Sequence, residues 1–164
     1  MFRRKQLTKE QAYQKLKHYC AYQDRCHSEL KDKAYSLGLR KTDVEELTAR
    51  LIEENALSEE RFAIKFAGGK FRMKQWGKAK IISELRRKRV NDYLIKKAIK
   101  EIANDDYMET VFLLAKKKWK GIKGEGVNQF VKMAKTRDYL LQKGYEAAVI
   151  AVVLKKLQEL CGQW

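Results

Sequence analysis

The fold is decided by residues 58–104, SEERFAIKFAGGKFRMKQWGKAKIISELRRKRVNDYLIKKAIKEIAN. This segment has three groups of apolar side chains, each spaced as on one face of an α-helix. A break near Trp76-Gly77 follows the first group, and Asn91 stands where it can cap the third helix. The groups are formed by Phe62, Ala63, Phe66 and Ala67, by Ile81, Ile82 and Leu85, and by Leu94, Ile95, Ala98 and Ile99. The segment is therefore predicted to form three short helices in succession.

The preceding segment has the same order of elements. Thr8-Lys9-Glu10-Gln11 and Thr42-Asp43-Val44-Glu45 have the capping-box pattern, which predicts helix starts at both places. A helix over 28–37 is predicted between them, with Gly38 as its left-handed cap, and Asn55 is expected to end the third helix. The inward positions are Ala12, Leu16, Tyr19, Cys20, Leu30, Ala34, Leu37, Val44, Leu47 and Leu51.

A third round of helices is predicted to start near Asp105-Asp106. A glycine-rich loop around Gly121, Gly124 and Gly126 separates its first two helices, and Gly144 forms the turn before the last one. The apolar pattern runs through Val111, Leu114, Ala115, Phe130, Val131, Ala134, Leu141, Val149, Ile150, Val153, Leu154 and Leu157.

The three rounds suggest an internal repeat. Aligning Ser28-Glu29-Leu30, Ser83-Glu84-Leu85 and Asp138-Tyr139-Leu140 gives a period of roughly 50 residues, in the range of helical repeat proteins. We predict an all-α protein of three tandem three-helix-bundle repeats, 1–57, 58–104 and 105–164, forming an elongated, curved body. A single irregular α-domain with regularly spaced helices is the alternative, because it has the same secondary structure.

Composition limits the class of protein. The chain has 164 residues, no proline, 45% hydrophobic residues and a formal charge of +16, which fits long helices around a real core. The longest apolar run, 147–154, is far shorter than the roughly 18 residues that cross a bilayer.

The basic start Met1-Phe2-Arg3-Arg4-Lys5 leads into a polar segment, so no secretory signal is expected. The odd number of cysteines, Cys20, Cys26 and Cys161, favours reduced thiols in a cytosol.

The positive charge is concentrated in the middle of the chain. Residues 1–57 have a net charge of +3, residues 58–104 of +9 and residues 105–164 of +4. A concentrated basic surface favours a polyanion or an acidic protein as the partner. The alternative is that these cations only solvate lysine-rich helices.

Two stretches mix cations with large apolar side chains. Around Phe71, Met73 and Trp76, such a mixture can bind a phosphate backbone and stack a base, or dock on a protein groove. A purely structural role, with Phe71 and Trp76 filling the core, is the alternative for the aromatic rings. The predicted interaction residues are Lys70, Arg72, Lys74, Trp76, Lys78, Lys80, Arg86 and Arg87, with Lys116, Lys117, Lys118 and Lys120 beside the glycine loop.

Catalytic and metal-binding patterns are weak. The two histidines, His18 and His27, lie in no base-and-nucleophile pattern, so we expect no enzyme and no cofactor. A zinc site with Cys20 and Cys26 is disfavoured, because His18 and Cys20 on one helix point about 160° apart. Gly77-Lys78 lacks the preceding glycine of a phosphate-binding loop.

Several of these segments resemble the RecX family of recombination regulators. The central signature is Ser58-Glu59-Glu60-Arg61-Phe62-Ala63 followed by Trp76-Gly77, Lys80-Ile81 and Glu84-Leu85. Arg25 with Ser28-Glu29-Leu30, and Lys143-Gly144-Tyr145 with Ile150, resemble the outer repeats. Two places depart from the family pattern: Asn55-Ala56-Leu57-Ser58-Glu59 replaces a stretch that commonly has glycine and aspartate, and Arg89 stands where glycine is common. Asparagine mimics glycine more comfortably than arginine does.

The resemblance implies a function. It implies a cytoplasmic bacterial protein, expected to be monomeric, that binds the RecA recombinase filament along its helical groove. It would restrain ATP hydrolysis, strand exchange and co-protease activity of RecA in DNA repair and recombination, with DNA contacted directly or through the filament. A free-standing basic DNA-binding protein is the alternative, and a membrane-surface role is disfavoured because the basic and apolar faces are spread over several short helices.

Overall fold

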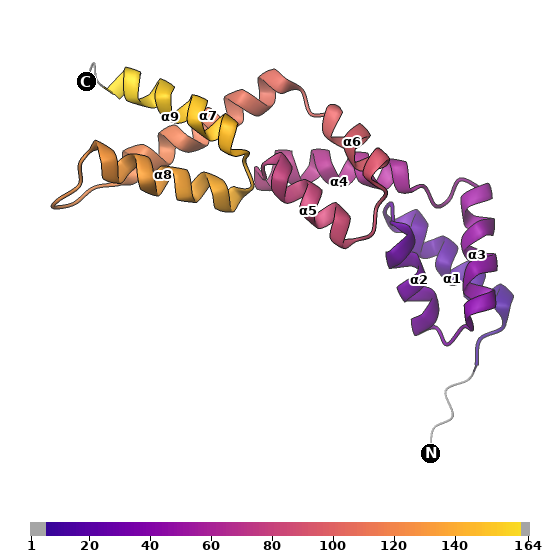
Figure 1. Ribbon diagram of the computed structural model, residues 1–164. Coiled ribbons are helices and arrows are strands. Elements are labelled where there is room, and N and C mark those ends of the chain that lie inside the picture. Colours follow the sequence, from indigo (N-terminus) through magenta and orange to yellow (C-terminus); the bar gives the residue numbers. More distant parts are fainter. Residues whose placement is uncertain (1–5, 162–164) are drawn as a thin grey trace. The chain divides into compact units, whose positions relative to one another are not determined.

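The computed structural model describes residues 6–161, so the basic start at Met1–Lys5 and the side chain of Cys161 lie outside the described part. Within that range the chain forms nine α-helices and no β-strand, which confirms the all-α prediction (Figure 1). The helices are α1 (Lys9–Tyr22), α2 (His27–Ser36), α3 (Lys41–Glu53), α4 (Glu59–Lys74), α5 (Lys78–Arg87), α6 (Asp92–Lys100), α7 (Asn104–Gly121), α8 (Gln129–Lys143) and α9 (Ala147–Cys161).

The helices gather into two compact units. The first unit extends to Phe66 and includes Leu85–Ala98, and the second contains Ala67–Glu84 and the chain from Ile99 onward. The first unit therefore contains α1, α2 and α3, and the second contains α7, α8 and α9. The residues of α4, α5 and α6 are divided between the two units. The repeat boundaries at 57 and 104 stay a prediction.

In the first unit, α1, α2 and α3 pack around Leu16, Leu30 and Leu51, whose side chains are fully buried. The capping box at Thr8 is confirmed, because its hydroxyl accepts from the Gln11 N–H and the Gln11 side chain accepts from the Thr8 N–H. This packing and capping define one face and one end of α1.

The second predicted capping box, at Thr42, is wrong. Helix α3 begins at Lys41 with Arg40 as its N-cap and no side-chain cap, so Thr42 already lies in the first helical turn. Leu39 packs on the core immediately before Arg40, and this contact brings the chain into the helix earlier than the Thr42 pattern indicated. A core contact here outweighs a local capping signal.

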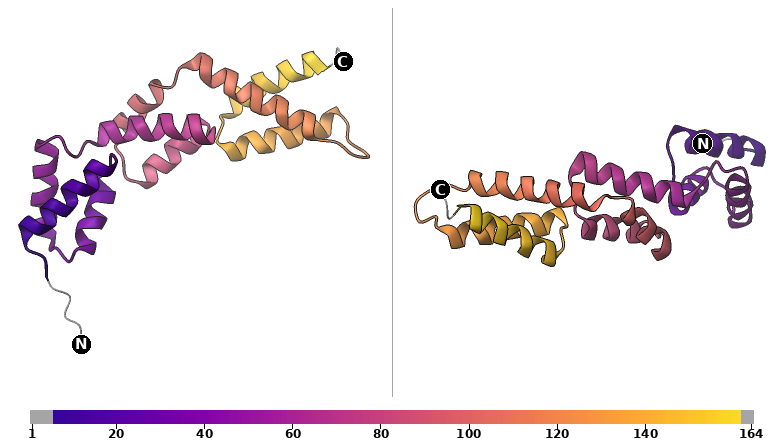
Figure 2. Two further views of the ribbon diagram at one scale, coloured as in Figure 1. Left: turned by 180° about the vertical axis from the view of Figure 1, so that it is seen from behind. Right: turned by 90° about the horizontal axis from the view of Figure 1, so that it is seen from above.

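In the second unit, α7, α8 and α9 lie side by side (Figure 1, Figure 2). Val111, Ile150 and Leu157 are buried, as the apolar pattern predicts. The pattern is wrong for Phe130 and Leu141, which are 79% and 48% exposed. The buried face of α8 contains Thr136 and Leu140 instead, four residues apart and therefore on one side of the helix.

Five of the described helices are followed within two residues by a residue with a left-handed backbone. These are Gly38 (φ 84°) after α2, Asn55 (φ 57°) after α3, Gln75 (φ 56°) after α4, Arg89 (φ 62°) after α5 and Gly144 (φ 94°) after α8. The caps expected at Gly38 and Asn55 are confirmed. Arg89 adopts the backbone that glycine would adopt there, although its Cβ makes this conformation costly.

These caps also correct the internal alignment. Leu85 and Leu140 each precede their left-handed residue by four positions, whereas Leu30 precedes Gly38 by eight. The alignment at Leu30 is therefore displaced by about one helical turn. A pattern as short as Ser-Glu-Leu can be aligned at more than one turn of a helix. For this reason the sequence alone misaligned the first repeat with the other two.

Candidate interaction surface

Two lysines lie over the ring of Trp76. The Nζ atoms of Lys70, on α4, and Lys80, on α5, are 5.0 and 4.6 Å from the centroid of the Trp76 ring. All three side chains are half-buried and belong to the second unit. Lys70, Trp76 and Lys80, hereafter the Trp76 cluster, thus form a fixed concentration of positive charge on an aromatic platform.

The turn that carries Trp76 is held by backbone pairing with the turn between α8 and α9. The Gly77 N–H donates to the Lys143 carbonyl at 2.8 Å, and the Ala79 N–H donates to the Gly144 carbonyl at 2.9 Å. These bonds satisfy N–H groups at the start of α5 that have no partner within the helix. The position of the Trp76 cluster therefore depends on a segment about 67 residues further along the chain.

Two tyrosines reinforce this turn. The Tyr145 hydroxyl donates to the Gln75 carbonyl at 2.8 Å, and Gln75 itself has a left-handed backbone (φ 56°). The Tyr107 hydroxyl accepts from the Lys78 N–H at 3.0 Å and donates to the Glu146 carboxylate. Burial raises the pKa of both tyrosines far above the ordinary value, and the Glu146 carboxylate raises that of Tyr107 further.

The aromatic and apolar residues of the middle stretch have different roles. Phe71 is buried and its ring lies 5.8 Å from that of Tyr107, so the structural interpretation holds for Phe71. Met73 is 84% exposed to solvent, and Trp76 is half-buried. The exposed edge of this stretch is therefore formed by Met73 and part of Trp76.

The remaining cations of the middle stretch surround the same turn. Arg72 and Lys74 are exposed near the end of α4, and the Arg72 guanidinium folds back over Gly68. The Lys78 Nζ lies 4.5 Å from the Tyr107 ring. Lys143, which no sequence pattern indicated as an interaction residue, donates from Nζ to the Lys74 carbonyl at 3.1 Å.

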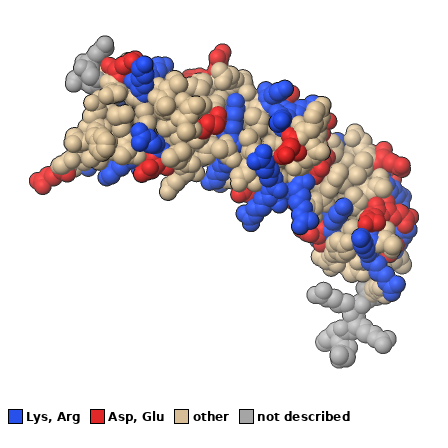
Figure 3. Space-filling model, in the orientation of Figure 1, with Lys and Arg blue, Asp and Glu red and all other residues tan. Residues whose placement is uncertain are grey.

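Arg86 and Arg87 lie at the other end of α5 from Lys80. Both are exposed in the last turn of α5, in the part that belongs to the first unit. Arg86 pairs with Asp92 at 3.3 Å. Their part in an interaction surface stays a prediction, and Lys and Arg atoms are dense over α5 on the face in Figure 3.

The lysines 116–120 are distributed around the end of α7, with Lys117, Lys118 and Lys120 exposed and Lys116 half-buried. Trp119, in the middle of the run, is buried and belongs to the core. Lys117 and Lys118 line a groove of 420 Å³ with Gln75 and Tyr139. Because Gln75 directly precedes Trp76, two of these lysines and the turn of the Trp76 cluster border one groove.

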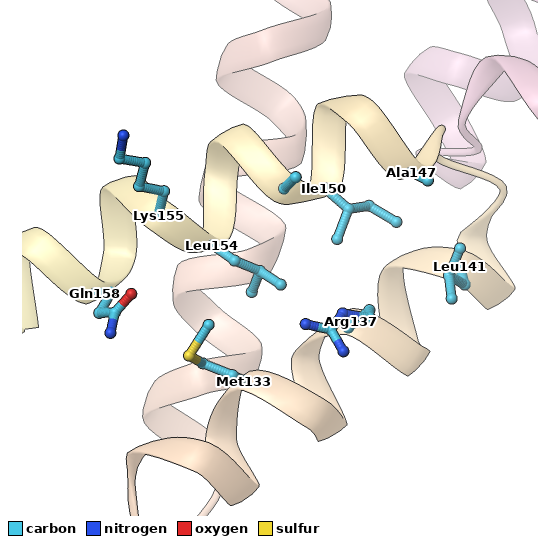
Figure 4. Close-up of a pocket in the computed structure, with 9 residues that line it drawn as sticks. Met133, Arg137, Leu141, Ala147, Ile150, Leu154, Lys155 and Gln158 are labelled. Atoms are coloured by element: carbon cyan, nitrogen blue, oxygen red, sulfur yellow. The ribbon is translucent and has the colours of Figure 1, made fainter.

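A second groove, of 290 Å³, lies between α8 and α9 and escaped the sequence analysis (Figure 4). Met133, Leu141, Ile150 and Leu154 form its apolar lining. Its cations are Arg137 and Lys155, one on each helix. The spacing of Arg137 and Leu141, four residues apart on α8, was the available signal, because such residues share a helix face.

The alternative chemistry considered for Cys20 and Cys26 gains no support. Both thiols are free and buried, and burial raises their pKa. The Cys26 Sγ lies 3.2 Å from both Ser28 Oγ and a Glu29 carboxylate oxygen. Across residues 6–161, no three His, Cys, Asp or Glu side chains are grouped so that they could hold a metal ion.

The same described range contains no helix with the length and apolar character needed to span a membrane.

Comparisons with known proteins agree on one family. The model of the RecX second three-helix domain matches residues 58–99, and that of the RecX third three-helix domain matches residues 105–154. A regulatory protein RecX from Vibrio parahaemolyticus is 31% identical over 126 residues, which cover 77% of this chain and 78% of that protein. One from Bacillus cytotoxicus is 23% identical over 150 residues, covering 92% of this chain.

The chain spans only 55% of the length of the Bacillus relatives. Among solved structures, RecX from Lactobacillus salivarius is similar with a TM-score of 0.83 and 21% identity, covering 92% of this chain and 96% of that one. A second RecX crystal structure has a TM-score of 0.79 and 19% identity, and covers 88% of this chain and 72% of that one. The structures support the three-helix fold, and the sequence matches establish the relationship: the chain belongs to the RecX family of regulatory proteins.

Proposed function

We propose that this chain regulates recombination by binding the RecA–DNA filament along its helical groove. Bound there, it restrains ATP hydrolysis, strand exchange and co-protease activity of RecA. The chain acts as a monomer in the cytoplasm, without catalysis or a cofactor. Membership of a family of regulatory proteins supports the regulatory role, and the Trp76 cluster is the observation that carries the binding surface.

The Trp76 cluster suits an acidic, DNA-containing groove. Its lysines are held over the indole ring, so less side-chain entropy is lost on binding than for freely rotating lysines. Lys117 and Lys118 border the adjoining groove and extend the positive surface along the second unit. Such a surface favours a polyanion and makes association dependent on salt concentration.

The groove between α8 and α9 supports a protein component of the target. Met133, Leu141, Ile150 and Leu154 offer an apolar lining that phosphate groups alone would not use. Arg137 adds a cation from α8, whereas the Lys155 ammonium points away from the groove (Figure 4). A target that presents both protein and nucleic acid satisfies the two kinds of surface in one complex.

Several contacts on one chain would explain both the preference for a filament over free RecA and the inhibition of RecA activity. Weak contacts to neighbouring protomers raise one another's effective concentration, which favours a filament over free RecA. A chain bound across protomers stabilises one conformation and opposes the cycling that hydrolysis and strand exchange require.

The test compares DNA alone with preformed RecA–ATP–DNA filament as the titrant, while ATP turnover is followed. We expect tighter binding to the filament and a fall in turnover as the chain is added. Tight, salt-sensitive DNA binding without an effect on turnover would instead favour a free-standing DNA-binding protein.

Charge-reversal variants localise the surface. Lys70→Glu with Lys80→Glu should weaken filament binding by about tenfold or more, because two attractive contacts become repulsive. Lys31→Glu with Lys96→Glu makes the same change of net charge at exposed positions on α2 and α6 and serves as the control. Equal losses in both pairs would show that net charge, rather than the Trp76 cluster, governs binding.

A further inference from the structure

The first unit contains a pocket that the proposed function does not use. It has a volume of 530 Å³ and is formed by α1, the turn after α1, and α2. This volume lies in the range of pockets that hold small ligands. The side chains that matter for its chemistry are Lys15, His18, Tyr19, Tyr22, Arg25 and Lys33.

The pocket offers aromatic rings at its surface. Tyr22, the last residue of α1, is 79% exposed, and Tyr19 is half-buried one turn earlier. A large aromatic side chain exposed to this extent contributes little to the core of the first unit. The exposed face of the Tyr22 ring is therefore available to a planar group of a ligand.

Arg25 is fixed beside these rings. Its guanidinium carbon lies 3.7 Å from the Tyr19 ring and 6.0 Å from the Tyr22 ring. Its Nε donates to the Tyr19 carbonyl at 3.2 Å. Because stacking and this hydrogen bond already hold the side chain, the other guanidinium N–H groups are preorganised to bind an anion.

The pocket lining is positively charged. Lys15, Arg25 and Lys33 contribute cations, and no carboxylate is found among its lining residues. Three acidic residues adjoin these lining cations in the sequence or lie within one helical turn of them. Asp24 pairs with Arg61 and Lys65, and Glu29 lies 3.8 Å from the Lys88 Nζ. Asp32, next to Lys33, is exposed and does not line the pocket. An anion that entered the pocket would therefore meet three cations and no carboxylate in the lining itself.

We propose that this pocket binds a nucleotide unit of single-stranded nucleic acid. The base stacks on Tyr22, and the phosphates beside it contact Arg25, Lys15 and Lys33. A planar ring next to an anion is the chemical signature of a nucleotide, and base-aromatic stacking with cations along the backbone is how single strands are bound. The exposure of Tyr22 leaves room for the strand to continue past the pocket, and this favours a strand over a free nucleotide.

The test uses the whole chain without RecA, so its result is independent of the proposed filament binding. A fluorescently labelled oligothymidylate of about 10 nucleotides is the probe, within the site sizes of single-strand binders. Tyr22→Ala should weaken binding by about tenfold or more, and Tyr22→Phe should retain it, because the ring face is preserved. Lys15→Gln and Lys33→Gln should each lower the salt dependence of binding by about one unit of slope.

Tyr35→Ala is the matched control, because Tyr35 is 47% exposed on α2 and does not line the pocket. An oligonucleotide with a photoreactive halogenated uracil identifies the stacked ring, and the crosslink is expected on Tyr22. Unchanged binding by Tyr22→Ala, or an equal loss in Tyr35→Ala, would overturn the proposal. So would a loss in Tyr22→Phe equal to that in Tyr22→Ala, a crosslink confined to other residues, or binding of ATP without binding of the oligonucleotide.

Discussion

Gly77 and Gly144 meet backbone to backbone. A Cβ atom on Gly77 would lie 2.3 Å from the carbonyl carbon and oxygen of Gly144, and a Cβ on Gly144 would lie 2.2 Å from the Cβ of Lys80. Neither position has room for any side chain. The two turns approach so closely because both lack one, and the approach allows the hydrogen bonds that hold the Trp76 cluster.

Gly77→Ala is expected to lower the free energy of unfolding by about 3 kcal/mol, since rigid backbone would have to move to admit the methyl group. Chemical denaturation monitored by circular dichroism measures this change. Gly69→Ala is the control: Gly69 lies in α4 with no atom within 4 Å of an added Cβ, so alanine should be neutral or stabilising there. Equal destabilisation in both variants would contradict the close approach.

Arg89→Gly is expected to stabilise the protein by about 1 kcal/mol. Arg89 is exposed, and its left-handed backbone costs free energy that glycine avoids. Arg89→Ala keeps the Cβ and so should not stabilise. Thermal unfolding of the two variants separates backbone strain from loss of the arginine charge, and a similar rise in Tm for both would indicate that charge is responsible.

Asp24 is expected to make stability depend on acid pH. Burial alone would raise the pKa of its carboxyl, but hydrogen bonds from Lys65 (2.8 Å) and Arg61 (2.5 Å) outweigh burial and lower it. A lowered folded-state pKa gives a contribution that is complete above the unfolded value, about 4, and is lost as pH falls through the folded value. Asp24→Asn should therefore cost about 2 kcal/mol at neutral pH.

The same substitution should flatten the decline of the free energy of unfolding below pH 4 or so. Urea denaturation at a series of pH values measures it. Asp138→Asn, at an exposed position on α8, should leave the decline unchanged. A decline in Asp24→Asn as steep as in the wild type would rule out the ion pairs of Asp24 as its cause.

The buried tyrosines predict a limit at alkaline pH. Burial raises the folded-state pKa of Tyr107 and Tyr145, so their contribution is complete below the unfolded value of about 10 and is lost as pH rises further. Two of the eight tyrosines should then ionise only as helicity is lost, which absorbance and circular dichroism follow together. Ionisation of all eight near pH 10, with helicity intact, would contradict their burial.

Tyr107→Phe should cost about 1–3 kcal/mol, because it leaves the Lys78 N–H and Glu146 without the hydroxyl. Tyr93→Phe is the control, since Tyr93 is exposed on α6. A comparable loss in Tyr93→Phe would show that the hydrogen bonds of Tyr107 are not the cause.

Helix positions were predictable from the sequence because they depend on local signals. Apolar spacing, the left-handed caps expected at Gly38 and Asn55, and the turn expected at Gly144 identified helices and several of their ends. The failures have long-range causes. At Thr42 the packing of Leu39 displaced a local cap, and at Phe130 the buried face of α8 turned toward other residues.

The candidate surface was predictable in part. Lys70, Trp76 and Lys80 were selected by composition, and their convergence requires the turn between α4 and α5. Neither the pairing of that turn with Lys143 and Gly144 nor the groove between α8 and α9 has a local pattern. Both arise from segments that are distant in the sequence.

The central signature illustrates the same limit. Ser58 caps α4 by accepting from the Arg61 N–H at 3.2 Å, which a local pattern can indicate. Glu60 pairs with Lys97 at 2.6 Å, and Arg61 pairs with Asp24. The resemblance marked these residues, but only the structure shows that Glu60 and Arg61 pair with two different segments of the first unit.

The backbone pairing of Gly77 and Ala79 also bears on how such chains gain or lose modules. A cut near residue 104 would remove the carbonyls of Lys143 and Gly144 and leave two amides at the start of α5 without their acceptors. The predicted boundary at residue 104 therefore separates two turns that are hydrogen-bonded to each other. A gene duplication or deletion at the repeat boundary would break these hydrogen bonds between the two turns. We therefore expect the two turns to be exchanged together when members of this family recombine.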